Sequence, residues 1–484
     1  MEEKVASASR AVQVGWLCEM RREVPREWTT ADVVESIVKP RTLAAQCRFV
    51  ELPEMRDGMR VGEAAAFASH TWGALFHELV ATLAHVFEST QFVWLDIFAV
   101  CQHPGEKQQA DLQEFVPLIT HARTLVLCVS HLPSLVEMDR GEVVAQSSHL
   151  LPLDERKKCA FFRVWCLLEL AAAAACSATV MMLVGSADED FAFVPNDETL
   201  DDLYHLIDVR NADATFESDK ALIFDTLLPQ TMGLDPATSI ARVNRLGRGA
   251  INGAEILLLE QTYVGEVMRP DERRAASRAV MQAAIGNFDP LSNLTKQGKA
   301  HALTGAAAAG FLEPLKYLLD AGAPIEQPDA SRGRTPLMLA SNGGHEKVVR
   351  ELIKRGADVN RIVAEGNVGD NALPLAAEGG HPSVLRLLID TGADLARYGP
   401  GAITLAAVDG HVDAIQVLLE AGVKPDERAA SGEFALSMAA TGGHLKAVKF
   451  LLDAGAGSAA AQQALAWTDA ARYPEIVGLL RNRV

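Results

Sequence analysis

The stretch "GRTPLMLASNGGHEKVVRELIKRGADVN", from Gly333 to Asn360, decides the fold of the C-terminal part of this chain. Thr335-Pro336 begins a helix, because the first N–H groups of a helix have no intrahelical partner and a proline is tolerated there. Gly343-Gly344 lets the chain double back, and apolar residues then recur at helical spacing from Val348 to Ile353. Gly356 ends the second helix in a left-handed conformation. The stretch therefore predicts a pair of helices joined by a tight turn.

The same pattern returns along the rest of the chain. Its segment "VRELIKRGADVN" has counterparts in "LKYLLDAGAPIE", "LRLLIDTGADLA", "IQVLLEAGVKPD" and "VKFLLDAGAGSA". The glycines of these segments lie 34, 36, 30 and 33 residues apart, at Gly322, Gly356, Gly392, Gly422 and Gly455. A second marker keeps the same step, at Gly310-Phe311, Gly344-His345, Gly380-His381, Gly410-His411 and Gly443-His444. A period of about 33 residues with two helices per unit is the ankyrin signature, and residues 298–484 resemble the ankyrin-repeat family.

This resemblance implies an all-α solenoid of five copies followed by a C-terminal cap. The last unit, Ala461 to Val484, ends in "EIVGLLRNRV" without a glycine turn, which suits a cap. Because one unit cannot bury its own apolar face, the copies have to stack into a long surface, on which we expect a protein partner to bind. The histidines of the second marker resemble a metal array, but we interpret them as turn residues and predict no metal site.

The composition is ordinary for a soluble protein, with 49% hydrophobic and 22% charged residues among 484. The net charge of −18 argues against nucleic-acid binding and against an anionic membrane surface, since both reward clustered lysine and arginine. The seven cysteines are scattered and form no C-x-x-C pair, so neither a zinc site nor a redox dithiol is indicated. The N-terminal "MEEKVASASR" lacks the apolar core of a secretory signal. We therefore expect a cytoplasmic protein with reduced thiols.

One apolar segment, Val164 to Val184, allows two interpretations. Its 21 residues carry a single charge, Glu169, and are long enough to span a bilayer. A carboxylate inside such a span is costly, and the flanks carry no anchor pattern. A buried helix followed by a buried strand explains the same composition, and we prefer this interpretation.

The N-terminal half alternates apolar runs with helical patterns. We expect strands at Ala64–Ser69, Phe92–Phe98, Thr124–Ser130 and Thr179–Gly185, with helices between them. Continuous apolar strands separated by helices predict an α/β fold with a parallel sheet covered on both faces. Ligands of such sheets bind beyond the carboxyl ends of the strands. The residues that fall there are Ser69, His70, Thr71, Asp96 to Val100, and Ser130.

Three motifs in residues 60–190 resemble the Toll/interleukin-1 receptor (TIR) superfamily, in the divergent form found next to ankyrin repeats in algae and protists. They are "FASHTWG" (Phe67–Gly73), "VWLDIFAV" (Val93–Val100) and "RVWCLLEL" (Arg163–Leu170). The resemblance implies a flavodoxin-like parallel sheet and self-association through this domain. Residues 1–59 then form a helical extension and residues 191–297 a helical connector. The chain departs from the family in having Arg163 where a serine precedes the Trp-Cys pair, and in a longer loop before this helix.

The TIR resemblance also implies a site. In active members the glutamate of the last motif cleaves NAD between nicotinamide and ribose, which points to Glu169 as catalytic, with no cofactor required and NAD as the substrate. Trp165 lies four residues earlier, on the same helix face. Ser69, His70, Trp72, Asp96 and Trp165 are then the residues that bind NAD. Ser69, His70 and Asp96 could also suggest a nucleophile with its base, but no G-x-S-x-G elbow surrounds the serine.

Two functions therefore stay open. In the first, the repeats bind a partner and the TIR-like half assembles or signals, while Glu169 is a solvent-facing charge and Trp165 a core residue. In the second, the protein is an NAD glycohydrolase that uses Glu169, and the repeats are a targeting or regulatory arm.

Overall fold

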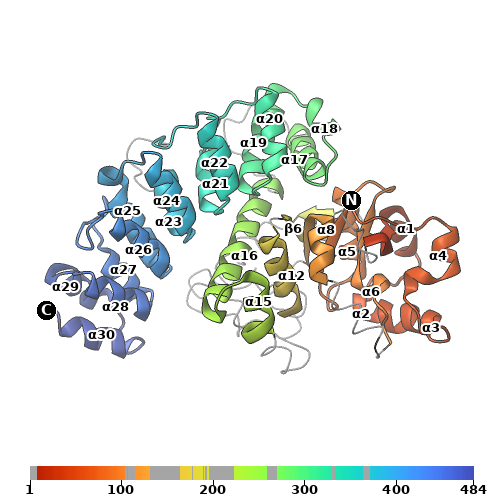
Figure 1. Cartoon of the computed structure of the whole chain (residues 1–484), viewed down its shortest axis with the longest axis horizontal. Helices are drawn as coiled ribbons and strands as arrows, with labels where there is room; N and C mark the ends of the chain where they lie inside the picture. The colour runs from red at the N-terminus through yellow and green to blue at the C-terminus, as the bar shows by residue number, and fades with distance from the viewer. Residues whose placement is uncertain are drawn as a thin grey trace. The chain divides into compact units, whose positions relative to one another are not determined.

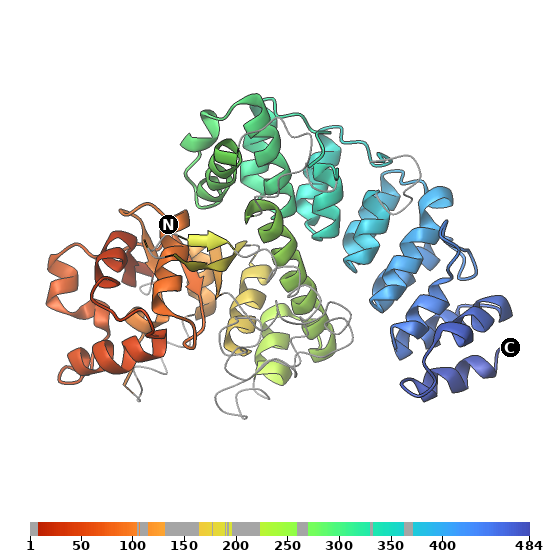
Figure 2. The same ribbon diagram turned by 180° about the vertical axis from the view of Figure 1, so that it is seen from behind.

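The computed structural model describes residues 8–103, 106, 115–130, 164–176, 178–188, 190, 193–195, 223–258, 270–329, 333–362 and 371–484. The chain divides into two compact units (Figures 1 and 2). The first consists of Met1–Glu260 with Arg269–Leu294, and the second of Gln261–Met268 with Thr295–Val484. Each unit is described by itself below.

The first unit is built on a seven-stranded sheet in the order β2-β1-β4-β3-β5-β6-β7. Its strands are β1 (Ala11–Gln13), β2 (Val61–Gly62), β3 (Ala66–Ser69), β4 (Phe92–Trp94), β5 (Thr124–Ser130), β6 (Thr179–Ala187) and β7 (Phe193–Pro195). The four predicted strands are the neighbours β4-β3-β5-β6, and they run parallel. The α/β prediction is confirmed in this part.

The sheet as a whole is mixed rather than parallel. Strand β1 pairs antiparallel with β2 and β4, and β7 pairs antiparallel with β6. Strand β1 comes from the stretch that the sequence predicted as a helical extension, residues 1–59. The predicted second strand is also too long, because Asp96–Ala99 forms the short helix α6 instead of continuing β4.

Helices of two sets pack around this sheet. Helix α5 contacts α1, α17 and strands β5 and β6, whereas α12 contacts α8, α15 and α16. The helical segments are η1 (Ala8–Arg10), α1 (Val14–Met20), α2 (Thr30–Val33), η2 (Val34–Val38), α3 (Lys39–Thr42), η3 (Phe49–Glu51), α4 (Pro53–Asp57), α5 (Phe76–Val86), α6 (Asp96–Ala99), α8 (Phe115–Ala122), α12 (Val164–Ala175), η7 (Ile223–Leu227), α15 (Leu228–Met232), α16 (Pro236–Leu258), α17 (Pro270–Ala284) and α18 (Asp289–Ser292).

The apolar segment Val164 to Val184 is helix α12 followed by strand β6, as the preferred interpretation predicted. Within the described ranges, no helix combines the length and the apolar character needed to cross a bilayer.

The second unit is a stack of helix pairs, which confirms the all-α prediction. The pairs are α19 (Lys296–Ala308) with α20 (Leu312–Asp320), α21 (Pro336–Asn342) with α22 (Glu346–Lys354), α23 (Ala372–Glu378) with α24 (Pro382–Asp390), α25 (Leu395–Val408) with α26 (Val412–Glu420), α27 (Ala435–Thr441) with α28 (Leu445–Asp453), and α29 (Ser458–Trp467) with α30 (Pro474–Arg481). Thr335 accepts a hydrogen bond from the N–H of Met338, with Pro336 at the start of α21, as the sequence indicated. Gly356 is left-handed, with φ +93°.

The repeat between Gly392 and Gly422 is shorter because it has no loop before its first helix. Helix α25 begins directly at Leu395, where Asp394 accepts a hydrogen bond from the N–H of Arg397 at 3.1 Å. Tyr398 lies in the first turns of this helix with 2% of its surface exposed. This longer helix was not predicted, because Pro400 lies inside it and proline ordinarily interrupts a helix.

The histidines of the second marker join consecutive repeats. The Nε2–H of His345 donates to the carbonyl of Ala308 at 2.8 Å, and that of His381 donates to Asn342 at 2.8 Å. His444 donates in the same way to Val408 at 2.7 Å. Burial lowers the pKa of His345 to about 4, so its ring is neutral at neutral pH. These contacts agree with the interpretation of the histidines as turn residues. No group of metal-ligating side chains occurs in the described part of the chain.

Each of these rings lies against the left-handed glycine of the preceding repeat. A Cβ added at Gly344, φ +73°, would come within 2.2 Å of the ring of His381. Gly310 has the same relation to His345, and in the cap Tyr473 covers Gly443 in the place of a histidine. Glycine is therefore required at this position for two reasons: its backbone is left-handed, and the ring above it leaves no room for a Cβ.

We predict that Gly344→Ala destabilises the array more than Gly322→Ala. Both glycines are left-handed, at φ +73° and +77°, so both variants carry a strain of roughly 1–2 kcal/mol. Only Gly344 lies beneath a ring, since a Cβ at Gly322 meets nothing within 4 Å. Displacing His381 adds roughly 1–3 kcal/mol. Urea unfolding of the full chain, with hydrogen exchange of the repeat amides as its readout, measures the loss of stability in each variant. Equal losses would show that the ring contact has no effect.

Candidate functional site

The loop after strand β3 is held by the first turn of helix α2. Ser69 is the last residue of β3, and His70, Thr71 and Trp72 follow it. The side chain of Thr30 donates to the carbonyl of Thr71 at 3.0 Å, and the N–H of Ala31 donates to the carbonyl of Trp72 at 3.0 Å. The N–H of Ala31 lies in the first turn of the helix and has no intrahelical partner, so the loop completes the helix end while the helix fixes the loop.

Asp96 lies beside this loop because β3 and β4 are parallel neighbours whose carboxyl ends meet at one edge of the sheet. The indole Nε1–H of Trp72 donates to Asp96 Oδ2 at 2.9 Å. Asp96 Oδ1 accepts from the N–H of Ile97 at 2.8 Å and lies 3.7 Å from Nε2 of His70. Trp72 is 38% exposed, and its hydrogen bond to Asp96 holds the indole ring at the surface of the site.

Helix α12 brings Glu169 to the same edge. The thiol of Cys166, one turn earlier, donates to the carbonyl of His70 at 3.5 Å. Glu169 is 9% exposed. Burial raises the pKa of its carboxyl to about 8, the negative charge of Asp96 raises the pKa further, and the hydroxyl of Ser69 opposes both. Glu169 is therefore mainly protonated at neutral pH.

Four buried polar atoms in this region have no hydrogen-bond partner within the described residues. They are Ser69 Oγ, His70 Nε2, Thr71 Oγ1 and Glu169 Oε2. Ser69 is close enough to affect Glu169, yet the two side chains make no hydrogen bond of normal geometry. Burial also lowers the pKa of His70, although Asp96 opposes this, so the imidazole is neutral. Buried polar atoms are nearly always paired in proteins, and a cluster of unpaired ones is typical of a site that takes a ligand.

The structure places Glu169, Ser69, His70, Trp72 and Asp96, which the sequence analysis named as candidate site residues, at one edge of the sheet. A Glu169 that faces solvent is not observed. The predicted site residue Trp165 lies in helix α12, but its side chain falls outside the described part of the structure. His70 and Ser69 do not form a nucleophile–base pair with each other, because neither Ser69 Oγ nor His70 Nε2 has a hydrogen-bond partner in the described region.

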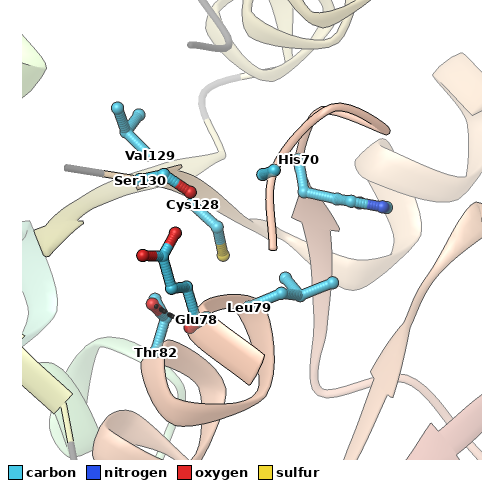
Figure 3. Close-up of a pocket in the computed structure, with 8 residues that line it drawn as sticks. His70, Glu78, Leu79, Thr82, Cys128, Val129 and Ser130 are labelled. Carbon is cyan, nitrogen blue, oxygen red and sulfur yellow. Dashed lines mark hydrogen bonds between the residues drawn. The ribbon is translucent and has the colours of Figure 1, made fainter. Parts of the chain in front are cut away.

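A hollow of about 200 Å³, which includes open solvent, adjoins this cluster at the carboxyl ends of β3 and β5 (Figure 3). Its lining consists of His70, Ala74, Glu78, Leu79, Thr82, Cys128, Val129 and Ser130. The side chains of Glu78 and Ser130 point toward each other, while the ring of His70 points away (Figure 3). Burial raises the pKa of the Cys128 thiol to about 12, so this cysteine is not a nucleophile.

Of these lining residues, the sequence indicated His70 and Ser130 but missed Glu78, Thr82 and Cys128. Glu78 and Thr82 lie on helix α5, where they follow the ordinary polar positions of an amphipathic helix. No local pattern separates them from surface residues, because only the packing of α5 against β5 brings them to this edge.

The matches to known proteins lie mainly in the second unit and begin in helix α17 of the first. Models of ankyrin repeats match residues 274–363, 303–398 and 403–452. The repeat period, the helix pairs and these matches agree. The second unit is an ankyrin-repeat array. Such arrays support a role in protein–protein interaction.

Among curated proteins, the array is similar to human "Ankyrin repeat and KH domain-containing protein 1", with 40% identity over 73 residues, and to zebrafish (Danio rerio) "Ankyrin repeat domain-containing protein 29", with 44% identity over 61 residues. These segments cover 15% and 13% of this chain, and only 3% and 20% of the relatives. A solved structure, the human ASB11 ankyrin repeat domain, has 26% identity and a TM-score of 0.32, covering 37% of this chain and 82% of that one.

We predict that Glu169 makes the stability of the protein fall with rising pH. The folded protein keeps the proton on Glu169 up to about pH 8, whereas the unfolded chain loses it near 4.5, the ordinary pKa of a glutamate. The free energy of unfolding therefore falls between these values by about 1.4 kcal/mol per pH unit from this group. Urea titrations of the wild type and Glu169→Gln from pH 5 to pH 8 measure the difference. The exposed control Glu23→Gln should keep the slope of the wild type, and the same slope in Glu169→Gln would contradict the assignment.

Proposed function

We propose that this protein is a cytoplasmic interaction scaffold, in which the ankyrin array binds a protein partner and a TIR-like first unit assembles or signals. The strand order supports the second part of this proposal. Taken in chain order, the four parallel strands lie second-first-third-fourth across the sheet, which is the order of flavodoxin-like sheets. The motif residues Ser69, Asp96 and Glu169 also lie at one edge of that sheet, as the TIR resemblance implies.

The observation that carries the partner-binding proposal is the row of loops between repeats. The N–H of Asp358 donates to Glu326 at 2.8 Å, and the N–H of Asp394 donates to the side chain of Asn360 at 2.9 Å. Farther along, the N–H of Gly457 donates to Asp426 at 2.7 Å. These contacts join described residues of neighbouring loops, so these parts of the loops are held in place before a partner arrives. Preorganisation of this kind reduces the entropy lost on binding.

We expect a partner to contact the exposed ends of these loops, where Arg361 and Lys424 lie. The double variant Arg361→Ala/Lys424→Ala should reduce the set of proteins that proximity labelling detects around the full chain. Lys347→Ala/Lys446→Ala removes two exposed charges from the second helices of repeats and should leave that set unchanged. If both variants reduce the set equally, the loops are not the specific binding surface, and if neither changes the set, partner binding at Arg361 and Lys424 is contradicted.

A second candidate function is an NAD glycohydrolase, and the burial of Glu169 beside Ser69 and Asp96 favours it. Cleavage of the bond between nicotinamide and ribose builds positive charge on the ribose, as in the oxocarbenium-like states of glycoside cleavage. A carboxylate in a water-poor site stabilises that charge more than one in water does. The unpaired atoms of Ser69 and Thr71 are suited to the hydroxyl groups of a ribose. The repeats are then a targeting or regulatory arm.

NAD turnover by the concentrated full chain tests this candidate. The reaction needs the ionised form of Glu169, so the rate should rise with pH toward about 8. Glu169→Gln should lose at least about 100-fold in rate, since it removes the charge that faces the transition state. The exposed control Glu23→Gln should keep the full rate. No turnover by the wild type at any concentration would exclude this function and leave the interaction scaffold.

A further inference from the structure

We propose that the ankyrin array binds an acidic segment of its protein partner through a surface at the N-terminal end of helix α25. This surface, called the α25 surface below, consists of Asn360-Arg361, Leu395–Tyr398 and Val423-Lys424. The proposal rests on the partner binding proposed above, and it adds the place on the array and the chemistry of the partner.

The row of loops between repeats is interrupted at the α25 surface. Residues 355–371 connect α22 to α23 and residues 421–434 connect α26 to α27, whereas only residues 391–394 connect α24 to α25. Helix α25 packs between α23 and α27 (Figures 1 and 2). The first turn of α25 therefore has no long loop of its own beside it, and Ala396 and Arg397 are exposed there.

Contacts join the three parts of the α25 surface. The N–H of Asp394 donates to the side chain of Asn360 at 2.9 Å, and the hydroxyl of Tyr398 donates to the carbonyl of Asn360 at 3.4 Å. Toward the next repeat, a Cβ added at Gly399 would lie 2.7 Å from the side chain of Val423. The three parts therefore form one continuous surface.

Three exposed cations lie on this surface, namely Arg361, Arg397 and Lys424. None of the three forms an ion pair within the described part of the chain. On the second helices of the repeats, by contrast, many cations are paired, for example Lys316 with Glu313, Arg350 with Glu346, Arg355 with Asp320, and Lys449 with Glu475. The cations of the α25 surface are therefore available to charges from another molecule.

Carboxylates of the same stretches are held close to the backbone. Asp358, Asp394 and Asp426 each accept a hydrogen bond from a backbone N–H group, at 2.9, 3.1 and 2.7 Å. Arginine and lysine have longer side chains, whose charged ends stay in water. Glu427 and Arg428, farther along the chain, offset each other in formal charge. The outermost charges of the α25 surface are therefore positive, although the chain carries a net charge of −18.

Arg397 is held in an orientation suited to a carboxylate. Its guanidinium group lies 5.4 Å from the centroid of the Tyr398 ring, which is itself fixed by burial with 2% of its surface exposed. The backbone N–H of Arg397 donates to the cap residue Asp394. A guanidinium group binds a carboxylate through two parallel N–H groups, and a held group loses less entropy on binding than a free one. We therefore expect Arg397 to be the main anchor for a partner carboxylate.

The size of the cationic surface favours a peptide segment over a nucleic acid or an anionic membrane. Those polyanions present charge over a large area, and the acidic remainder of the chain would repel them. A short segment with a few aspartates or glutamates needs only local attraction, since charges more than about 8 Å away are largely screened at physiological ionic strength. An acidic segment of a protein therefore fits this surface.

Selection from a displayed library of random peptides tests the place and the chemistry together. The full chain and its triple variant Arg361→Ala/Arg397→Ala/Lys424→Ala are used in parallel selections. We expect the peptides that bind the wild type but not the variant to be richer in Asp and Glu than the starting library. All three substituted side chains are exposed, so the variant should keep the fold.

A matched control removes three exposed cations elsewhere in the array. The variant Lys347→Ala/Lys446→Ala/Arg481→Ala takes the same charge from the second helices and should retain the acidic peptides. Loss of these peptides in the control as well would show that net charge, and not the α25 surface, attracts them, and would overturn the proposal.

Titration of one selected peptide into the full chain measures the contribution of Arg397. Arg397→Ala should weaken the affinity about tenfold or more, since a charge-assisted pair of hydrogen bonds is lost. Arg397→Glu should weaken it further, because like charges then face each other. Equal affinities of the wild type and both variants would contradict the role of Arg397 as the anchor.

The outcomes of this proposal can be told apart from those of partner binding by the array. Selected peptides without an excess of Asp and Glu, or equal binding by the triple variant, overturn the α25 surface but leave partner binding elsewhere on the array. No selected peptide at all overturns the acidic-segment proposal, while proximity labelling still tests whether the array has a partner. Displacement of the peptide by single-stranded oligothymidine at equal affinity would also overturn it, because the surface then recognises any polyanion.

Discussion

A pair of helices in the array can bury its apolar face only against the next pair, and the array depends on how consecutive pairs meet. The contact between a ring and a left-handed glycine fixes how consecutive helix pairs pack against each other. His345 lies against Gly310 and His381 against Gly344, and each ring donates a hydrogen bond to a carbonyl of the repeat before it. Tyr473 covers Gly443 in the cap, so the same packing ends the array.

The first unit depends on a different constraint, the parallel pairing of β3 with β4 and β5. Parallel strands place their carboxyl ends at one edge, so residues far apart in sequence gather there. Ser69 ends β3, His70 to Trp72 follow it, and Asp96 follows β4. Helix α12 covers this edge and places Glu169 there, so that Glu169 is buried from water. The enclosure raises the pKa of Glu169 and leaves several polar atoms unpaired, and both features mark the edge as a candidate functional site.

Elements with a long sequence pattern could be predicted, and elements with a short pattern could not. Strand β5 was predicted with its observed bounds, Thr124–Ser130, because a continuous apolar run is a strong local signal. Strands β1, β2 and β7 were missed, since elements of two or three residues show no periodicity. The second strand was predicted too long because the apolar run through Phe98 continues into helix α6. Helix α25 was missed because Pro400 interrupts its pattern.

The sequence by itself determined the repeat array, the four parallel strands and the residues that follow the strands. All of these depend on local periodicity and on the conformational preferences of glycine and proline, which a single chain displays directly. Only the tertiary structure decided that Glu169 is buried, that Trp72 donates to Asp96, 24 residues away, and that Cys166 donates to His70, 96 residues away. It also placed Glu78 and Thr82 beside a hollow. Hydrogen bonds and burial of this kind depend on which distant segments pack together, and no local pattern records that choice.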